Sequence, residues 1–150
     1  YNNQICVMQC NTNYTASKNN LKYINLNVLR KYKKTFPNVI LGLSDHTHGH
    51  STVLGAITLG ARMVEKHFTI SNNLEGPDHK FSMTPKTWKE MIERSRELES
   101  ALGSENKMIE VNEKQAFLVP RRSVHFIKNI NKKAALTIIR IFLIKTFILV

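Results

Sequence analysis

Two histidines stand at the ends of predicted buried strands, where a protein can hold a metal ion. His46 follows the apolar run 38–43, and His67 lies near the end of the predicted strand 62–69. A neutral imidazole donates a lone pair without adding charge, which makes it a good ligand for divalent metals. Neighbouring strand ends would together supply part of a coordination shell and leave its other positions open to water and substrate. At each position, a structural histidine that is simply hydrogen-bonded is the alternative.

Two further histidines make the first cluster look like a three-histidine metal site. His48 and His50 alternate with His46 along the chain. In an extended strand Gly42, Ser44 and His46 share one face, whereas His48 and His50 fall in the following loop and helix start. We therefore assign chemistry to His46 and treat the other two as ordinary surface or core histidines.

Charged residues surround His67 and the loop that follows it. Glu65 shares the strand face of His67, and a buried charge pair between Glu65 and Lys66 is the structural alternative for this strand. Asp78, in the Gly-Pro loop, can bind sugar hydroxyls or a metal-bound water, and Lys80 can neutralise an anionic group. Loops rich in glycine and proline also simply turn, so this cluster alone is a weak signal.

Two polar side chains follow the first predicted strand, 5–10. If the extended conformation continues, Cys10, Thr12 and Tyr14 share a face, which brings Thr12 and Tyr14 to the same end of the sheet. A tyrosine at a strand end more often serves packing than catalysis.

The elements that must position these residues alternate between strand and helix. Apolar runs predict strands at 5–10, 38–43 and 62–69, and helical periodicity predicts helices at 21–36, 51–61 and 85–102. Pro37 closes the first helix; Thr84 caps the third, and Gly103 ends it. This order predicts an α/β fold with a parallel sheet, either doubly wound or a closed barrel, with the chemistry at the carboxyl ends of the strands. Three βα units cannot close an eight-stranded barrel, so a barrel would be present only in part.

Net charge by itself would suggest an anionic partner. The formal charge of the 150 residues is +11, but the segment from Pro120 onward contains seven Lys or Arg and no acid, so it carries +7 of the total. Elsewhere the cations lie among acids or on helix faces, without the interleaved aromatics that stack on bases. The apolar tail 138–150 is too short and too charged to span a membrane. We expect neither nucleic acid nor membrane as a partner.

The cysteines and the start of the chain indicate a reducing compartment. Cys6 and Cys10 lie four residues apart in a predicted strand, on the same face but too far along it for a disulfide. We expect two core thiols. No cationic and apolar leader opens the sequence, so a cytoplasmic location is expected.

Taken together, the clusters resemble the sialic acid synthase family, which includes the N-acetylneuraminate, legionaminate and pseudaminate synthases. The resemblance extends from Ile5 to about Thr137, under half of a typical family member. It rests on six segments: Gln9–Tyr14 (QCNTNY), Gly42–His46 (GLSDH), Glu65–Phe68 (EKHF), Gly76–Lys80 (GPDHK), Phe81–Met83 (FSM) and Arg121–Ser123 (RRS).

The resemblance implies a domain organisation. Residues 1–104 would be the last three βα units of a TIM barrel, 105–119 a linker, and 120–137 the start of a small, β-rich antifreeze-like domain. Residues 138–150 form an apolar tail that departs from the family pattern. Full-length members of such a family would be homodimers.

The resemblance also implies an activity. Such enzymes condense phosphoenolpyruvate with an N-acetylated hexosamine, such as N-acetylmannosamine or a diacetamido-trideoxyhexose, to give a nine-carbon 2-keto sugar acid and phosphate. By analogy His46 and His67 would hold a divalent ion, typically Mn²⁺ with Mg²⁺ or Co²⁺ as alternatives. Thr12 and Ser44 would contact phosphoenolpyruvate, and Tyr14 and Asp78 the sugar. The catalytic residues would then be His46, His67 and Asp78.

Two alternatives stay open. In the family, most residues that hold phosphoenolpyruvate belong to strands that would precede Tyr1, so the chain can instead be a truncated, inactive remnant that serves at most as a binding or association surface. A metal-dependent hydrolase on a similar barrel would need further metal-binding strand ends.

Overall fold

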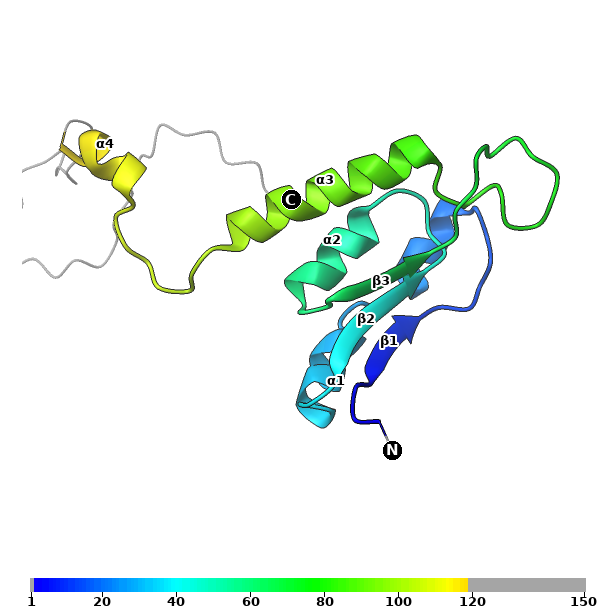
Figure 1. The fold of residues 1–150 in the computed structure, drawn as a ribbon, viewed down its shortest axis with the longest axis horizontal. Helices are drawn as coiled ribbons and strands as arrows, with labels where there is room; N and C mark the ends of the chain where they lie inside the picture. Colours follow the sequence, from blue (N-terminus) through cyan, green and yellow to red (C-terminus); the bar gives the residue numbers. More distant parts are fainter. Residues whose placement is uncertain (1, 119–150) are drawn as a thin grey trace, which may run out of the picture. The chain divides into compact units, whose positions relative to one another are not determined.

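A three-stranded parallel sheet and the helices on one of its faces make up most of the first unit of the structure, a computed structural model that describes residues 2–118. The strands are β1 (Cys6–Cys10), β2 (Ile40–Asp45) and β3 (Met63–Lys66), in the spatial order β1-β2-β3 (Figure 1). They belong to a compact unit that ends at residue 105, and the described residues 106–118 belong to a second unit. The predicted α/β class with a parallel sheet is confirmed.

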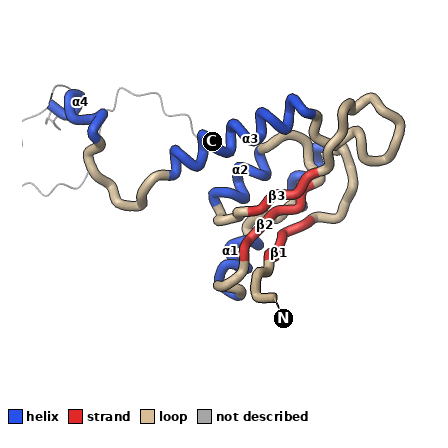
Figure 2. The backbone as a smooth tube through the Cα atoms, in the orientation of Figure 1, coloured by secondary structure: helices blue, strands red, loops and turns tan. Residues whose placement is uncertain are grey.

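Helices follow the strands in alternation (Figure 2). α1 (Val28–Thr35) contacts β1 and β2, α2 (Ser51–Thr58) contacts β2, and α3 (Pro85–Leu102) contacts α2. These contacts build one core from buried apolar side chains of all three helices, β2 and the connecting segments: Leu29, Leu41, Leu43, Val53, Ala56, Ala61, Met83 and Met91.

The two faces of the sheet differ because side chains alternate along a strand. Leu41 and Leu43 are buried among the helices, whereas the intervening Gly42 lies on the other face. A Cβ at Gly42 would come within 2.8 Å of Met8 Cγ and 3.0 Å of the Met63 carbonyl oxygen. The absence of a side chain at Gly42 therefore leaves room for the Met8 side chain and the Met63 backbone on either side of β2.

The first predicted helix is wrong as one continuous element. The structure has a 3₁₀ helix, η1 (Lys18–Tyr23), and then the separate α1. Asn25 lies between them with a φ of +52°. Asparagine tolerates this left-handed conformation better than most residues, so a helical apolar stripe runs across a break that periodicity does not reveal.

The second and third strands are displaced from their predicted bounds. β2 begins and ends two residues later than expected, so Ser44 and Asp45 are strand residues and His46 comes directly after them. β3 ends at Lys66, and the chain beyond it pairs with a later segment through an isolated parallel bridge between Phe68 and Met83. Residues predicted as the end of this strand thus bond to the segment before α3 instead of to β2.

The third helix has the predicted ends. The Thr84 side chain accepts a hydrogen bond from the Thr87 backbone N–H, and Thr87 Oγ1 accepts one from the Thr84 backbone N–H, a reciprocal capping box. Pro85 opens the helix, and Gly103 ends it at a φ of +49°. Side-chain capping at the first end of α3 and backbone conformation at the last thus determine its bounds.

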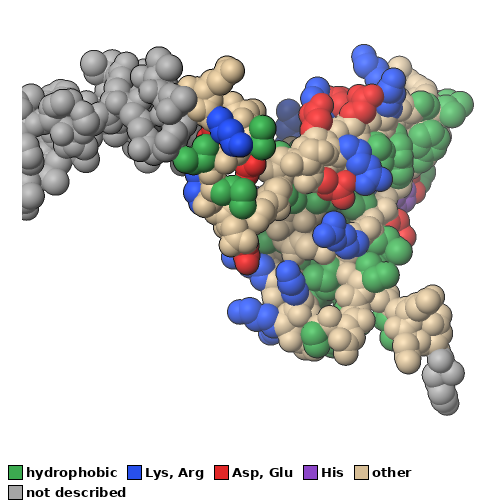
Figure 3. All heavy atoms as spheres, turned by 60° about the vertical axis from the view of Figure 1, so that its left-hand side comes forward, with side chains coloured by type: hydrophobic (Ala, Val, Ile, Leu, Met, Phe, Trp, Pro, Cys, Tyr) green, Lys and Arg blue, Asp and Glu red, His purple; other side chains and the backbone are tan. Residues whose placement is uncertain are grey.

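The second unit contains a short 3₁₀ helix, η2 (Val111–Glu113), and α4 (Lys114–Leu118). The predicted antifreeze-like segment 120–137 and the apolar tail 138–150 lie outside the described residues. Within residues 2–118, no helix combines the length and apolarity needed to cross a bilayer. On the face drawn in Figure 3, Lys and Arg side chains are interspersed with Asp and Glu.

The packing predicts the cost of truncating β2 on its two sides. Leu43 is fully buried, whereas Ile40 is 46% exposed. We expect Leu43→Ala to lower the free energy of unfolding by about 2 to 5 kcal/mol, because it leaves a cavity in the core. Ile40→Ala should cost less than half as much. Chemical denaturation of the full chain measures both, and equal losses would contradict the assigned core.

Candidate functional site

His46 and His67 lie side by side beyond the carboxyl ends of β2 and β3. Their ring centroids are 5.1 Å apart. The strand register explains this proximity, because Asp45 pairs with Lys66 and the next residue of each strand is a histidine. The structure confirms the predicted placement of the two imidazoles at the same end of the sheet.

A backbone carbonyl determines the orientation of the His46 ring. His46 is 4% exposed, and its Nδ1 lies 2.9 Å from the carbonyl oxygen of Asn11, in the loop after β1. A carbonyl oxygen only accepts hydrogen bonds, so Nδ1 carries the hydrogen and donates it. In the neutral ring, Nε2 then keeps its lone pair. This is the tautomer that a metal-ligating histidine needs.

A carboxylate, that of Asp78, lies near the Nδ1 atom of His67. Asp78 Oδ2 is 3.4 Å from His67 Nδ1. The Asp78 carbonyl oxygen accepts hydrogen bonds from the Ser82 hydroxyl at 2.7 Å and the Ser82 backbone N–H at 3.2 Å, which hold this part of the loop. A carboxylate beside Nδ1 favours a hydrogen on that nitrogen and leaves Nε2 as the second donor of the pair.

Two aromatic rings border the histidine pair. The Tyr14 ring centroid lies 4.2 Å from that of His46 and 5.4 Å from that of His67. Phe81 is buried, with its ring 6.1 Å from His46 and 5.1 Å from His67. Tyr14 therefore lies at the rim where it was predicted. The sequence placed Phe81 in a motif but did not predict its contact with the histidines.

Ser44 and Glu65 form a second polar pair at the same strand ends. The Ser44 hydroxyl donates to Glu65 Oε1 at 2.7 Å, and the two residues are register partners. The suggested buried pair between Glu65 and Lys66 is wrong: Glu65 is exposed, and Lys66 bonds to Asp45 instead, at 2.6 Å. Strand alternation explains the difference, because adjacent residues point to opposite faces.

The remaining candidate residues make no described contact with the two histidines. Thr12, His48 and Lys80 are exposed, and His50 is the N-cap residue of α2. Cys10 is also exposed, which corrects the expectation that both cysteines are core thiols; both are free, as predicted. Among residues 2–118, no group of three His, Cys, Asp or Glu side chains could hold a metal. In the described residues, the candidate metal ligands are thus two imidazoles, which would make only part of a coordination shell.

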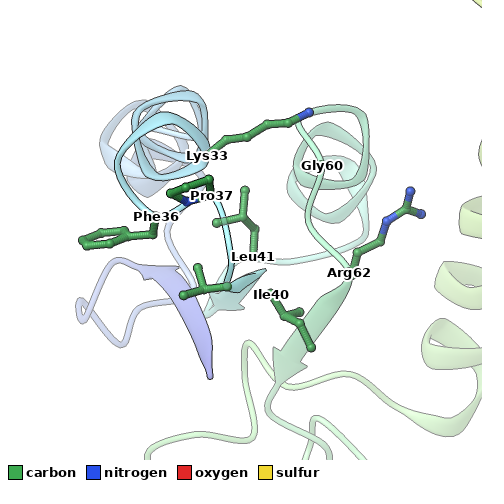
Figure 4. A pocket seen from close by; sticks show the side chains of 8 residues that line it. Lys33, Phe36, Pro37, Ile40, Leu41, Gly60 and Arg62 are labelled. Atoms are coloured by element: carbon green, nitrogen blue, oxygen red, sulfur yellow. The ribbon is translucent and has the colours of Figure 1, made fainter. Parts of the chain in front are cut away.

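A separate pocket lies at the other end of the sheet (Figure 4). It has a volume of about 230 Å³ and includes Ile40, the first residue of β2, and Arg62, directly before β3. Lys33 and Phe36 from the α1 region also line it. The histidine pair lies beyond the opposite, carboxyl ends of these strands, so the pocket and the pair are distinct.

Residues 1–107 match the NeuB family. This chain belongs to that family. It is 41% identical over 102 residues to the spore coat polysaccharide biosynthesis protein SpsE of Bacillus subtilis, covering 67% of the chain and 26% of that protein. It is 35% identical over 128 residues to an N,N'-diacetyllegionaminic acid synthase of Campylobacter jejuni, covering 85% of the chain and 37% of that enzyme.

Solved structures agree with the family assignment. The crystal structure of B. subtilis SpsE matches with a TM-score of 0.62 over 67% of this chain and 28% of that one. An N-acetylneuraminic acid synthetase from Leptospira borgpetersenii matches with a TM-score of 0.63 at 24% identity, over 75% and 38% of the two chains, which supports the fold alone. The chain thus spans well under half the length of each of these relatives.

The tautomer of His46 is open to direct measurement. Long-range ¹H–¹⁵N NMR spectra of the neutral ring should show the hydrogen on Nδ1 and an unprotonated Nε2, because the Asn11 carbonyl can only accept. The exposed His48 provides the comparison and should show the mixture of tautomers typical of a solvated ring. A hydrogen predominantly on Nε2 of His46 would contradict the assigned geometry.

Proposed function

We propose that this chain is part of a sialic-acid-type synthase that joins phosphoenolpyruvate to an N-acetylated hexosamine. The product would be a nine-carbon 2-keto sugar acid, with release of phosphate. The observation that carries this proposal is the paired imidazoles of His46 and His67 in a member of the NeuB family, with the Asn11 carbonyl bonded to Nδ1 of the first and the Asp78 carboxylate 3.4 Å from Nδ1 of the second. One of its relatives is an N,N'-diacetyllegionaminic acid synthase and another, in human, an N-acetylneuraminate-9-phosphate synthase.

The donor set fits a divalent ion, for which Mn²⁺ is our first choice and Mg²⁺ or Co²⁺ the alternatives. His46 and His67 would hold it through Nε2, with Asn11 and Asp78 fixing the rings from behind. When bound, such an ion supplies a positive charge that polarises the aldehyde oxygen of the open-chain sugar. Two imidazoles leave further coordination positions for substrate and water.

The reaction forms one carbon–carbon bond and breaks one bond to phosphate. Carbon 3 of phosphoenolpyruvate attacks the aldehyde carbon, whose oxygen becomes negative while carbon 2 of the enol becomes positive. Water adds at carbon 2, and phosphate leaves as the ketone forms. A site for this chemistry must stabilise a negative charge on the former aldehyde oxygen and a positive charge on carbon 2, on either side of the new carbon–carbon bond.

The chain's own polar residues divide between the two substrates in this proposal. Tyr14, half-exposed beside His46, and Asp78, in the loop beside His67, would contact the sugar. Ser44, beside Glu65, and Thr12, in the loop after β1, would contact phosphoenolpyruvate. Glu65 is exposed and Ser44 is partly exposed at the strand ends, which leaves this face accessible to a substrate.

The second candidate is an inactive remnant that acts as an association surface. It is favoured by a sheet that has three strands in the described residues. In this case the histidine pair would persist without turnover.

Phosphate release distinguishes the two. The chain is mixed with phosphoenolpyruvate, Mn²⁺ and either N-acetylmannosamine or a diacetamido-trideoxyhexose. If the chain is an enzyme, His46→Ala should lower kcat/KM by on the order of 100-fold or more, because it removes a metal ligand. His48→Ala, two residues away and exposed, should leave it unchanged. No turnover by the unmodified chain would favour the remnant.

The sugar contact of Tyr14 has its own test. Tyr14 and Tyr23 are both 56% exposed, but among the described ring contacts only Tyr14 lies against the histidines. We expect Tyr14→Ala to raise the KM for the hexosamine about tenfold, the loss of one moderate contact, with little change for phosphoenolpyruvate. Tyr23→Ala should change neither constant. A rise confined to the KM for phosphoenolpyruvate would place Tyr14 on the other substrate.

A further inference from the structure

A buried ion pair lies directly behind the two histidines. Lys66 Nζ is 2.6 Å from Asp45 Oδ2, and the two side chains are 1% and 0% exposed. Asp45 immediately precedes His46, and Lys66 immediately precedes His67. The pair therefore joins the last paired residues of β2 and β3 at the point where the strand ladder stops.

Two threonines complete the network around this pair. Asp45 Oδ2 also accepts from the hydroxyls of Thr52 at 2.6 Å and Thr47 at 3.0 Å, and Asp45 Oδ1 accepts from the Thr47 backbone N–H at 3.1 Å. Lys66 Nζ makes a second bond, at 2.6 Å, to the Thr47 carbonyl oxygen. Since Thr52 belongs to the first turn of α2, the network ties both strand ends to that helix.

Residues of the network flank His46 in the chain. The backbone N–H of Thr47 donates to Asp45 and its carbonyl oxygen accepts from Lys66, so the residue that follows His46 is bonded to both members of the ion pair. His46 is thus held between two residues of the network, and His67 follows a third. No comparable connection is provided by the sheet ladder, whose last register pair is Asp45 with Lys66.

A buried ion pair is an inefficient way to stabilise a fold. Removing two charges from water costs free energy that their attraction often only balances, and apolar side chains of similar volume are frequently as stable. Such a pair has directional bonds, however, and apolar packing does not. The position of this ion pair, next to both histidines, is what a role in orienting them requires.

We propose that Asp45 and Lys66, with Thr47 and Thr52, are positioning residues that set the spacing and orientation of the His46 and His67 rings. They act through the backbone and touch no reacting atom. The consequence for metal affinity rests on the proposed function, whereas the consequence for ring geometry does not depend on it.

The main test replaces the ion pair with apolar side chains of similar size, in the variant Asp45→Leu/Lys66→Met. We expect this variant to fold with a somewhat lower denaturation midpoint, because no charge is left buried and unpaired but the Thr47 backbone groups lose their partners. The NOE between the His46 and His67 rings in the metal-free protein should weaken or vanish. Affinity for Mn²⁺, measured by EPR titration, should fall about 10- to 100-fold.

A matched control removes an ion pair elsewhere. Arg94 and Glu97 form an exposed pair on α3 at 2.8 Å. Arg94→Met/Glu97→Leu should preserve both the NOE and the Mn²⁺ affinity. A buried-pair variant that folds and retains both would overturn the positioning role.

A milder variant keeps the proposal testable if the double replacement does not fold. Thr52→Val removes one hydroxyl from the network with little change in volume, and we expect a weaker NOE and a few-fold loss of Mn²⁺ affinity. An unfolded double variant together with an unaffected Thr52→Val would show that the network serves folding alone, which overturns the proposal. If the unmodified chain binds no Mn²⁺, the proposed function fails, and the metal-free NOE still decides the positioning role.

Discussion

The pairing of β2 with both of its neighbours is the constraint on which the rest of this structure depends. Its parallel register brings Cys10, Ser44 and Glu65 into one row across the sheet and aligns Asp45 with Lys66. All three strands therefore end at the same edge, and the residues that follow them meet there. A shift of one residue in either register would turn each polar side chain to the opposite face.

Strand alternation gives the two sides of this edge different chemistry. On the helix-covered side, Asp45 and Lys66 form an ion pair, and both side chains are buried. On the other side, Ser44 and Glu65 are accessible. The histidine pair follows both, so the face proposed for the substrate is polar and partly exposed, while the ion pair on the other side is buried.

Much of the fold could be predicted from the sequence because its signals are local. Thr84, Pro85 and Gly103 define α3 through capping bonds and backbone preferences that involve only near neighbours. The order of strands and helices follows from hydrophobic periodicity, and it led correctly to a parallel sheet. The break at Asn25 and the end of β3 at Lys66 could not be predicted in this way. The first depends on one backbone dihedral, and the second on a bridge to Met83 from a distant part of the chain.

For the site, the sequence by itself determined which residue types stand at the strand ends: two histidines, a serine, a tyrosine and a loop aspartate. Only the tertiary structure decided their partners. The Asn11 carbonyl that orients His46 lies 35 residues away in sequence, and Asp45, the partner of Lys66, lies 21 residues away. Such pairs form because packing and register bring them within bonding distance, and no local pattern records that. A motif therefore specifies the functional groups, and the sheet specifies their geometry.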